Sequence, residues 1–106
     1  MDLYIDDGYT NTRTVPATPG LLPELRIKYR QALARVRIEH RATLDTKDTD
    51  LITRRENELF KNYVVTVNEQ PLNKDLNRLK PALRAVLIDL ILGYAGADEE
   101  ADAKNS

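Results

Sequence analysis

The sequence predicts a mainly α fold, a small single domain of three to four helices with a short β element near its N-terminal side. The chain has 106 residues, which suits one domain. It is 42% hydrophobic and 31% charged, enough apolar material for a core. Several segments show the apolar spacing of helices, whereas one short segment alternates with the period of a strand.

Residues 1–23 are expected to form a flexible or extended N-terminal arm. Glycines and prolines interrupt any helical pattern there, at Gly8, Pro16, Pro19, Gly20 and Pro23. Within the arm, Leu3–Ile5 and Thr12–Val15 are candidates for short extended pieces, the second because it is rich in β-branched residues.

The folded domain is expected to span residues 24–96. From Leu25 to Arg30, apolar and charged residues alternate, as in a half-buried strand. The spacing then changes, and Ala32, Leu33, Val36 and His40 predict one side of a helix over residues 31–41.

A polar loop follows at 43–49 and is expected to supply the N-cap of a second helix over 49–62. The four residues Val64–Val67 either extend that helix or form a short strand, since β-branched residues favour extended backbone. Residues 73–79 predict one or two helical turns.

The segment from Pro81 to Tyr94 predicts the most apolar helix, because ten of its fourteen residues are hydrophobic. Proline suits its first turn, and Gly93 or Gly96 is expected to end it. It is too short to span a bilayer, which takes about 20 apolar residues. Residues 97–106 lack large apolar side chains and are expected to form a disordered acidic tail.

Composition narrows the classes of function. The net charge of −1 provides no global attraction to nucleic acid or an anionic membrane. The absence of cysteine excludes disulfides and thiolate metal sites. The acidic N-terminal residues do not resemble a signal peptide, so we expect a cytoplasmic protein.

No motif predicts catalysis or a cofactor. His40 is the only histidine and is interpreted as a packing residue. Asp45, Asp48 and Asp50 suggest a calcium loop, but the glycine such a loop needs at its sixth position is Asp50, so helix capping is the better interpretation. No glycine-rich phosphate loop or serine nucleophile motif occurs, and we therefore expect no enzyme activity.

A basic segment offers one alternative function. Six cations stand against two acids in 18 residues, and they could contact phosphates: Arg26, Lys28, Arg30, Arg35, Arg37 and Arg41. Aromatic residues for stacking on bases are limited to Tyr29, so nucleic acid is the less favoured partner.

The apolar C-terminal helix leaves two interpretations open. It is either the core element alone, or a core element that also offers a surface to a protein partner or a second copy. The residues expected to bind the partner are Leu83, Leu87, Leu90, Ile91 and Tyr94.

The order of these segments resembles small phage- or prophage-derived proteins of the tail-assembly-chaperone type. The resemblance rests on the strand ending in Ile27-Lys28-Tyr29-Arg30, the charged helical middle leading to Tyr63–Val67, and the run from Asn73 to Leu83 into the apolar helix ending Leu92-Gly93-Tyr94. It departs from related sequences at Gln31, where proline is common, and in lacking tryptophan. The resemblance implies a non-enzymatic escort of tail or tape-measure proteins, without catalytic residues.

The sequence therefore predicts a cytoplasmic protein-binding or assembly factor, with homo-oligomerisation open. The alternatives are a nucleic-acid-binding regulator using the basic segment and a structural component of a phage-like particle.

Overall fold

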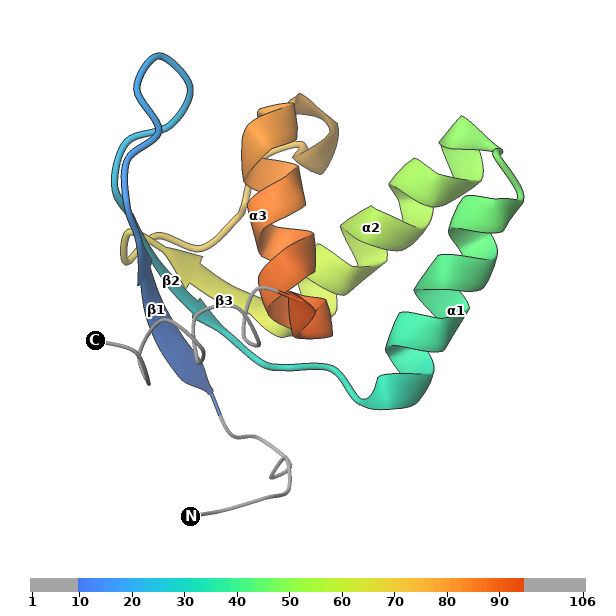
Figure 1. Cartoon of the computed structure of the whole chain (residues 1–106). Helices are drawn as coiled ribbons and strands as arrows, with labels where there is room; N and C mark the ends of the chain where they lie inside the picture. Colours follow the sequence, from blue (N-terminus) through green and yellow to red (C-terminus); the bar gives the residue numbers. More distant parts are fainter. Residues whose placement is uncertain (1–9, 95–106) are drawn as a thin grey trace.

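The computed structural model describes residues 10–94 and shows an α+β fold (Figure 1). Three strands form one antiparallel sheet in the order β1-β2-β3. The elements in chain order are β1 (Asn11–Val15), β2 (Leu25–Tyr29), α1 (Ala34–Asp45), α2 (Thr49–Tyr63), β3 (Val64–Val67), the 3-10 turn η1 (Leu76–Arg78) and α3 (Pro81–Leu92). The expected mainly α fold with one short β element is therefore wrong.

Two strands that local patterns indicate only weakly account for the correction. β1 lies inside the predicted arm, yet it pairs along its whole length with β2, from Asn11 opposite Tyr29 to Val15 opposite Leu25. β3 follows α2 without a loop and pairs with β2 on the other side. The backbone groups of a strand point to both of its sides, so β2 finds hydrogen-bond partners for them in β1 and β3 and becomes the central strand of the sheet.

The alternation predicted for β2 is confirmed. Leu25, Ile27 and Tyr29 are buried, while Arg26 and Lys28 between them are exposed on the opposite face. The sheet therefore has one apolar face and one polar face, as an antiparallel sheet covered on one side requires.

Helix α3 covers the apolar face of the sheet, and α2 packs beside it (Figure 1). The core joins β2 to α2 and α3, with Ile27, Phe60, Leu87 and Ile91 as its largest fully buried side chains. Gly93 ends α3 with a φ of 83°, in the left-handed conformation that glycine adopts easily.

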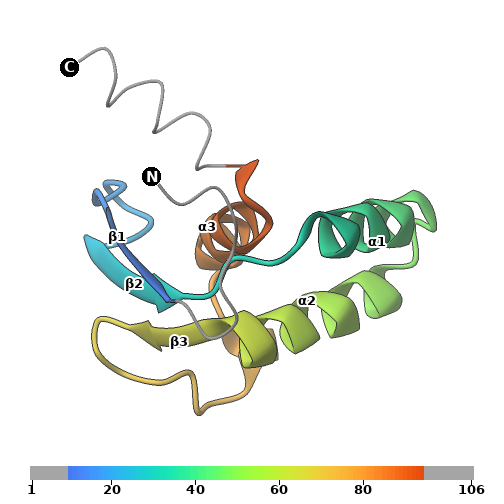
Figure 2. The same cartoon turned by 90° about the horizontal axis from the view of Figure 1, so that it is seen from below.

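Helices α1 and α2 form a hairpin that extends away from the sheet, with α1 outermost (Figure 2). The second helix is placed as predicted, and Asp48 caps it by accepting from the backbone N–H of Leu51 at 3.1 Å. α1 begins three residues later than predicted, at Ala34, because the N–H of Ala32 donates to the carbonyl of Ile91 and the preceding backbone stays extended.

The expected helical turns over 73–79 reduce to η1. The possible strand at Leu3–Ile5 and the expected tail at 97–106 lie outside the described residues.

Candidate functional site

The residues expected to bind a partner on α3 lie largely in the core. Leu87 and Ile91 are fully buried and Leu90 is 2% exposed, while Leu83 and Tyr94 are partly buried. The solvent side of α3 carries Pro81, Ala85 and Asp89, which are small or charged. Contact between a partner and the three buried residues would require α3 to leave the sheet.

The six cations of the basic segment are divided among separate surfaces. Arg26 and Lys28 lie on the polar face of the sheet, where Arg26 pairs with Glu69 at 3.1 Å. Arg30 is exposed just after β2. Arg35 and Arg41 are exposed on α1, whereas Arg37 turns inward.

Arg37 attaches α1 to the end of α3. Its Nε donates to the carbonyl of Leu92 at 2.9 Å, and its guanidinium lies 4.5 Å from the centre of the Tyr94 ring. The last carbonyls of a helix have no partner within it. Arg37 and the N–H of Ala32 supply partners for two of them and fix which side of α1 faces inward.

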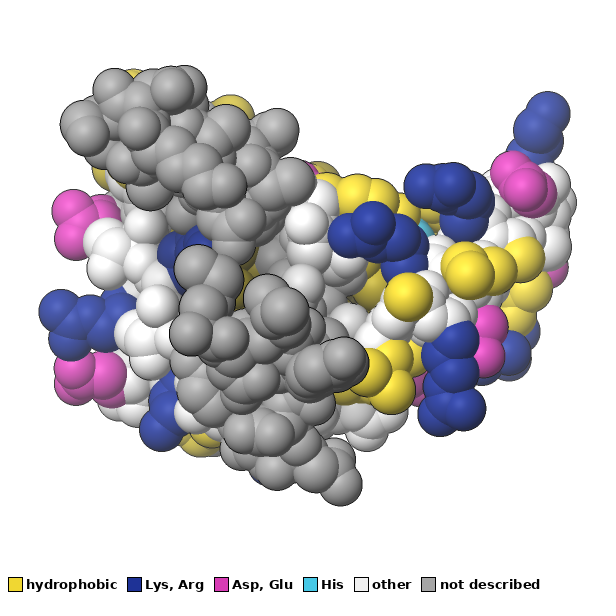
Figure 3. All heavy atoms as spheres, turned by 60° about the horizontal axis from the view of Figure 1, so that its bottom comes forward, with side chains coloured by type: hydrophobic (Ala, Val, Ile, Leu, Met, Phe, Trp, Pro, Cys, Tyr) yellow, Lys and Arg dark blue, Asp and Glu magenta, His cyan; other side chains and the backbone are white. Residues whose placement is uncertain are grey.

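The outward side of α1 carries an apolar stripe that sequence reasoning missed. Ala34, Ile38 and Ala42 follow one another at intervals of four residues, and all three are exposed, Ile38 to 67%. Arg35 and Arg41 stand three residues to either side of Ile38 and are its surface neighbours on a helix. Figure 3 shows yellow and dark blue side chains intermingled on the right of the molecule, where Figure 1 places α1.

This outer face of α1, defined by Ala34, Arg35, Ile38, Arg41 and Ala42, is the candidate functional site. Leu33 and Leu44 are also exposed, to 53% and 44%, but at five residues before and six residues after Ile38 they lie on other sides of the helix. Single exposed apolar side chains are common on soluble domains, whereas apolar side chains gathered on one face mark a candidate interaction surface. The signal in the sequence was the spacing of Ala34, Ile38 and Ala42 at intervals of four residues. These three residues lie on the side of the helix opposite Val36 and His40.

A hollow of about 450 Å³ opens between α1 and α2, beside the outer face. Arg35 and Ala42 belong to both, so the two features are continuous. Val36, Leu59 and Tyr63 supply the apolar part of the lining. Glu39 and Glu58 contribute acidic groups from the two helices.

His40 is the one residue of α1 that is buried, with its side chain 5% exposed. Neither ring nitrogen has a hydrogen-bond partner among the described residues. Its Nε2 lies 4.0 Å from a carboxylate oxygen of Glu56, beyond hydrogen-bond distance. The interpretation of His40 as a packing residue agrees with this burial.

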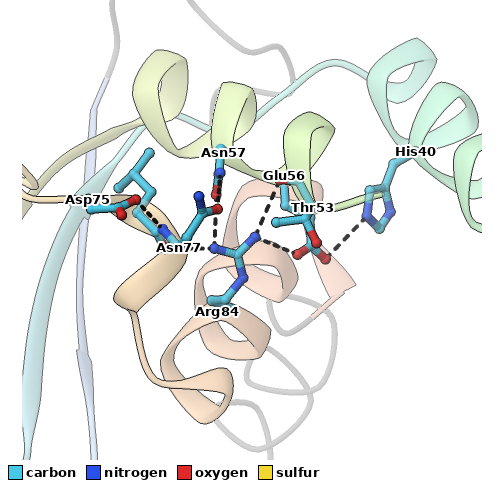
Figure 4. Close-up of polar contacts among 8 residues, drawn as sticks. His40, Thr53, Glu56, Asn57, Asp75, Asn77 and Arg84 are labelled. Atoms are coloured by element: carbon cyan, nitrogen blue, oxygen red, sulfur yellow. Dashed lines mark hydrogen bonds and ion pairs between the residues drawn. The ribbon is translucent and has the colours of Figure 1, made fainter. Parts of the chain in front are cut away.

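The other oxygen of Glu56 accepts from Arg84 of α3 at 2.9 Å (Figure 4). Arg84 also donates to Asn57 and to the carbonyl of Leu76, both at 2.9 Å, and lies over the Phe60 ring. The one cation inside this apolar helix therefore joins α2, η1 and α3. Both terminal nitrogens of the guanidinium therefore have acceptors, as a largely buried charge requires.

Within residues 10–94, no three acidic or histidine side chains gather closely enough to hold a metal ion. In this part of the chain, none of the helices has both the length and the apolar character needed to cross a bilayer. Comparison with protein-family models, curated proteins and solved structures gives no match. Inferences about function therefore rest on the geometry.

Proposed function

We propose that this chain is a non-enzymatic protein-binding domain whose docking surface is the outer face of α1. The observation that carries the proposal is Ile38, a large apolar side chain 67% exposed between two exposed alanines. Burying such a side chain contributes about 1.5–3 kcal/mol. The inward side of α1 is held against the domain by the hydrogen bond from Arg37 to the carbonyl of Leu92 and by the burial of His40, so the outer face points toward solvent.

The location of the surface differs from the one expected on α3. The three-stranded sheet and α2 cover Leu87, Leu90 and Ile91, so the apolar character of α3 supports the domain itself. Leu83 and Tyr94 remain partly exposed beside the core. In this proposal α3 stabilises the domain, and α1 carries the surface that contacts the partner.

The biological role that we propose is assembly of protein complexes in the cytoplasm. The resemblance to tail-assembly chaperones makes tail and tape-measure proteins the first partners to test. A helix with an exposed apolar stripe suits a protein that covers an apolar segment of another chain until assembly is complete.

A photo-crosslinking side chain placed at position 38, with a matched one at position 21, tests the proposal in the source cells. Leu21 is also exposed, to 56%, but lies in the loop between β1 and β2. We expect one identifiable protein adduct at position 38 and none of that protein at position 21. Equal labelling at both positions, or no protein adduct at 38, would contradict the proposal.

The alternative of nucleic-acid binding is favoured by one observation, the exposed Arg26 and Lys28 on the central strand β2 and the exposed Arg30 just after it. Titration of labelled DNA and RNA at several salt concentrations separates the two functions. Phosphate binding through these cations weakens steeply as salt rises. We expect no such salt-dependent binding.

A further inference from the structure

We propose that the occupant of the outer face of α1 is an amphipathic helix of another protein, in which glutamate or aspartate residues flank an apolar stripe. The inference rests on the proposed function and specifies its partner. Three features of the surface support it, namely its relief, its charge and the adjoining hollow.

The relief of the surface fits a helix. Ala34 and Ala42 are small, so the ridge of Ile38 stands between two shallow positions on one line. Small residues allow two helices to approach to about 8 Å between axes. α1 has 12 residues, which gives about 18 Å of contact length.

The positive charge of the surface favours a partner helix with acidic residues on either side of its apolar stripe. Arg35 and Arg41 are exposed beside Ile38, and neither forms an ion pair within the described part of the chain. Glutamates on either side of an apolar stripe would meet these two guanidiniums when the stripes pack together. At the hollow, Glu39 and Glu58 are balanced by Arg35 and Arg55, so the preference for acidic flanks rests on the two arginines beside Ile38.

The hollow can hold one larger side chain of the occupant. Its volume of about 450 Å³ exceeds that of any single side chain, and Val36, Leu59 and Tyr63 line it. A leucine or phenylalanine entering from the stripe would bury apolar area against them. Such a central anchor is the usual source of affinity in a helix-binding groove.

A second copy of this chain is the competing occupant of the same surface. Each copy would bring two cations, Arg35 and Arg41, and one acid, Glu39, to the contact, so both sides would carry net positive charge. Acidic flanks on a different protein would neutralise that charge, so charge favours a different protein over self-association.

Two helical peptides with the same leucine and alanine stripe test the inference, one flanked by glutamates and one by lysines. Their affinities are measured by fluorescence anisotropy with the full chain and with three variants, Ile38→Asp, Arg35→Glu/Arg41→Glu and the control Leu21→Asp. We expect the glutamate peptide to bind the full chain and Leu21→Asp at least about tenfold more tightly than the lysine peptide. Ile38→Asp abolishes binding, and the double charge reversal transfers the preference to the lysine peptide.

Equal affinity for both peptides, or no binding of either, would overturn the inference. Sedimentation that shows dimers of the full chain and monomers of Ile38→Asp would also overturn it, in favour of a second copy. Thermal unfolding checks that each variant folds, because all three positions substituted on α1 are exposed. A protein adduct at position 38 without a glutamate preference would contradict this inference while leaving the proposed function intact.

Discussion

Arg84 and Glu56 form an ion pair of 2.9 Å between α3 and α2, with side chains 13% and 20% exposed. The same guanidinium donates to the carbonyl of Leu76, so a single side chain holds three elements together. This ion pair explains why α3, an otherwise largely apolar helix, contains an arginine. It also leads to the first prediction.

Replacement of Arg84 by methionine is expected to lower the free energy of unfolding by about 3 kcal/mol, because it leaves Glu56 and the Leu76 carbonyl without their donor. Urea denaturation measures the change. Arg55→Met is the control, since Arg55 and Glu58 are 3.6 Å apart and more than half exposed. Exposed pairs contribute about 0–1 kcal/mol, and equal losses in the two variants would contradict the assigned role of Arg84.

Two glycines with left-handed backbone provide a matched pair for the second prediction. Gly20 has a φ of 79° with open space around it, whereas a Cβ at Gly93 would lie 2.6 Å from Nε2 of Gln31 and 3.0 Å from Nη2 of Arg37. Gly20→Ala should cost about 1 kcal/mol from backbone strain alone. Gly93→Ala should cost more, because the amide of Gln31 must also move away and the guanidinium of Arg37 must shift at the end of α3. Equal losses in urea denaturation would contradict this contact.

The third prediction concerns the ring of His40, whose two nitrogens have no hydrogen-bond partner among the described residues. A buried polar group without a hydrogen bond costs about 1–3 kcal/mol, so His40→Leu is expected to leave stability unchanged or to raise it. His40→Ala should lower it by about 2 kcal/mol, because it enlarges the space between α1 and α2. If His40→Leu destabilises the protein as much as His40→Ala, a polar interaction of the ring matters after all.

The fourth prediction separates the core from the docking surface. Leu87→Ala is expected to lower the free energy of unfolding by about 3 kcal/mol, because Leu87 is fully buried. Ile38→Ala should change it by less than about 0.5 kcal/mol, because Ile38 is 67% exposed. Thermal or urea unfolding measures both. A large loss at Ile38 would show that α1 packs its outer side against the rest of the domain.

Local patterns predicted the elements whose signals are contained in their own residues. The alternation of β2, the Asp48 cap of α2 and the proline start of α3 are all found where the sequence indicated them. Each depends on neighbouring residues, through side-chain period or capping geometry. Interactions within a few residues therefore sufficed for these parts of the fold.

The parts that were missed depend on partners distant in sequence. Val64–Val67 was open between helix and strand, and pairing with β2, some 40 residues earlier in the chain, decides for the strand. Asn11–Val15 likewise becomes a strand through β2. Because Thr12–Val15 was expected only as a short extended piece and Val64–Val67 was left open, the expected sheet appeared too small to cover α3, and the partner surface was expected on that helix.

The candidate site shows the same dependence. α1 has apolar residues on two sides, Val36 and His40 on one and Ala34, Ile38 and Ala42 on the other. The spacing predicted the side of Val36 and His40 as the packed one, and the burial of His40 and partial burial of Val36 confirm it, whereas Leu33, expected on that side, is 53% exposed. Arg37, by donating to Leu92, determines which one faces the domain and which one faces solvent.

The most direct test of the account is the pattern of amide NMR shifts when the glutamate-flanked peptide is added to the labelled full chain. The account predicts that the largest changes lie in α1, between Ala34 and Ala42, with smaller changes at the hollow-lining residues Leu59 and Tyr63 of α2. Changes concentrated on α3, from Leu83 to Tyr94, or on β2 at Arg26 and Lys28, would contradict it.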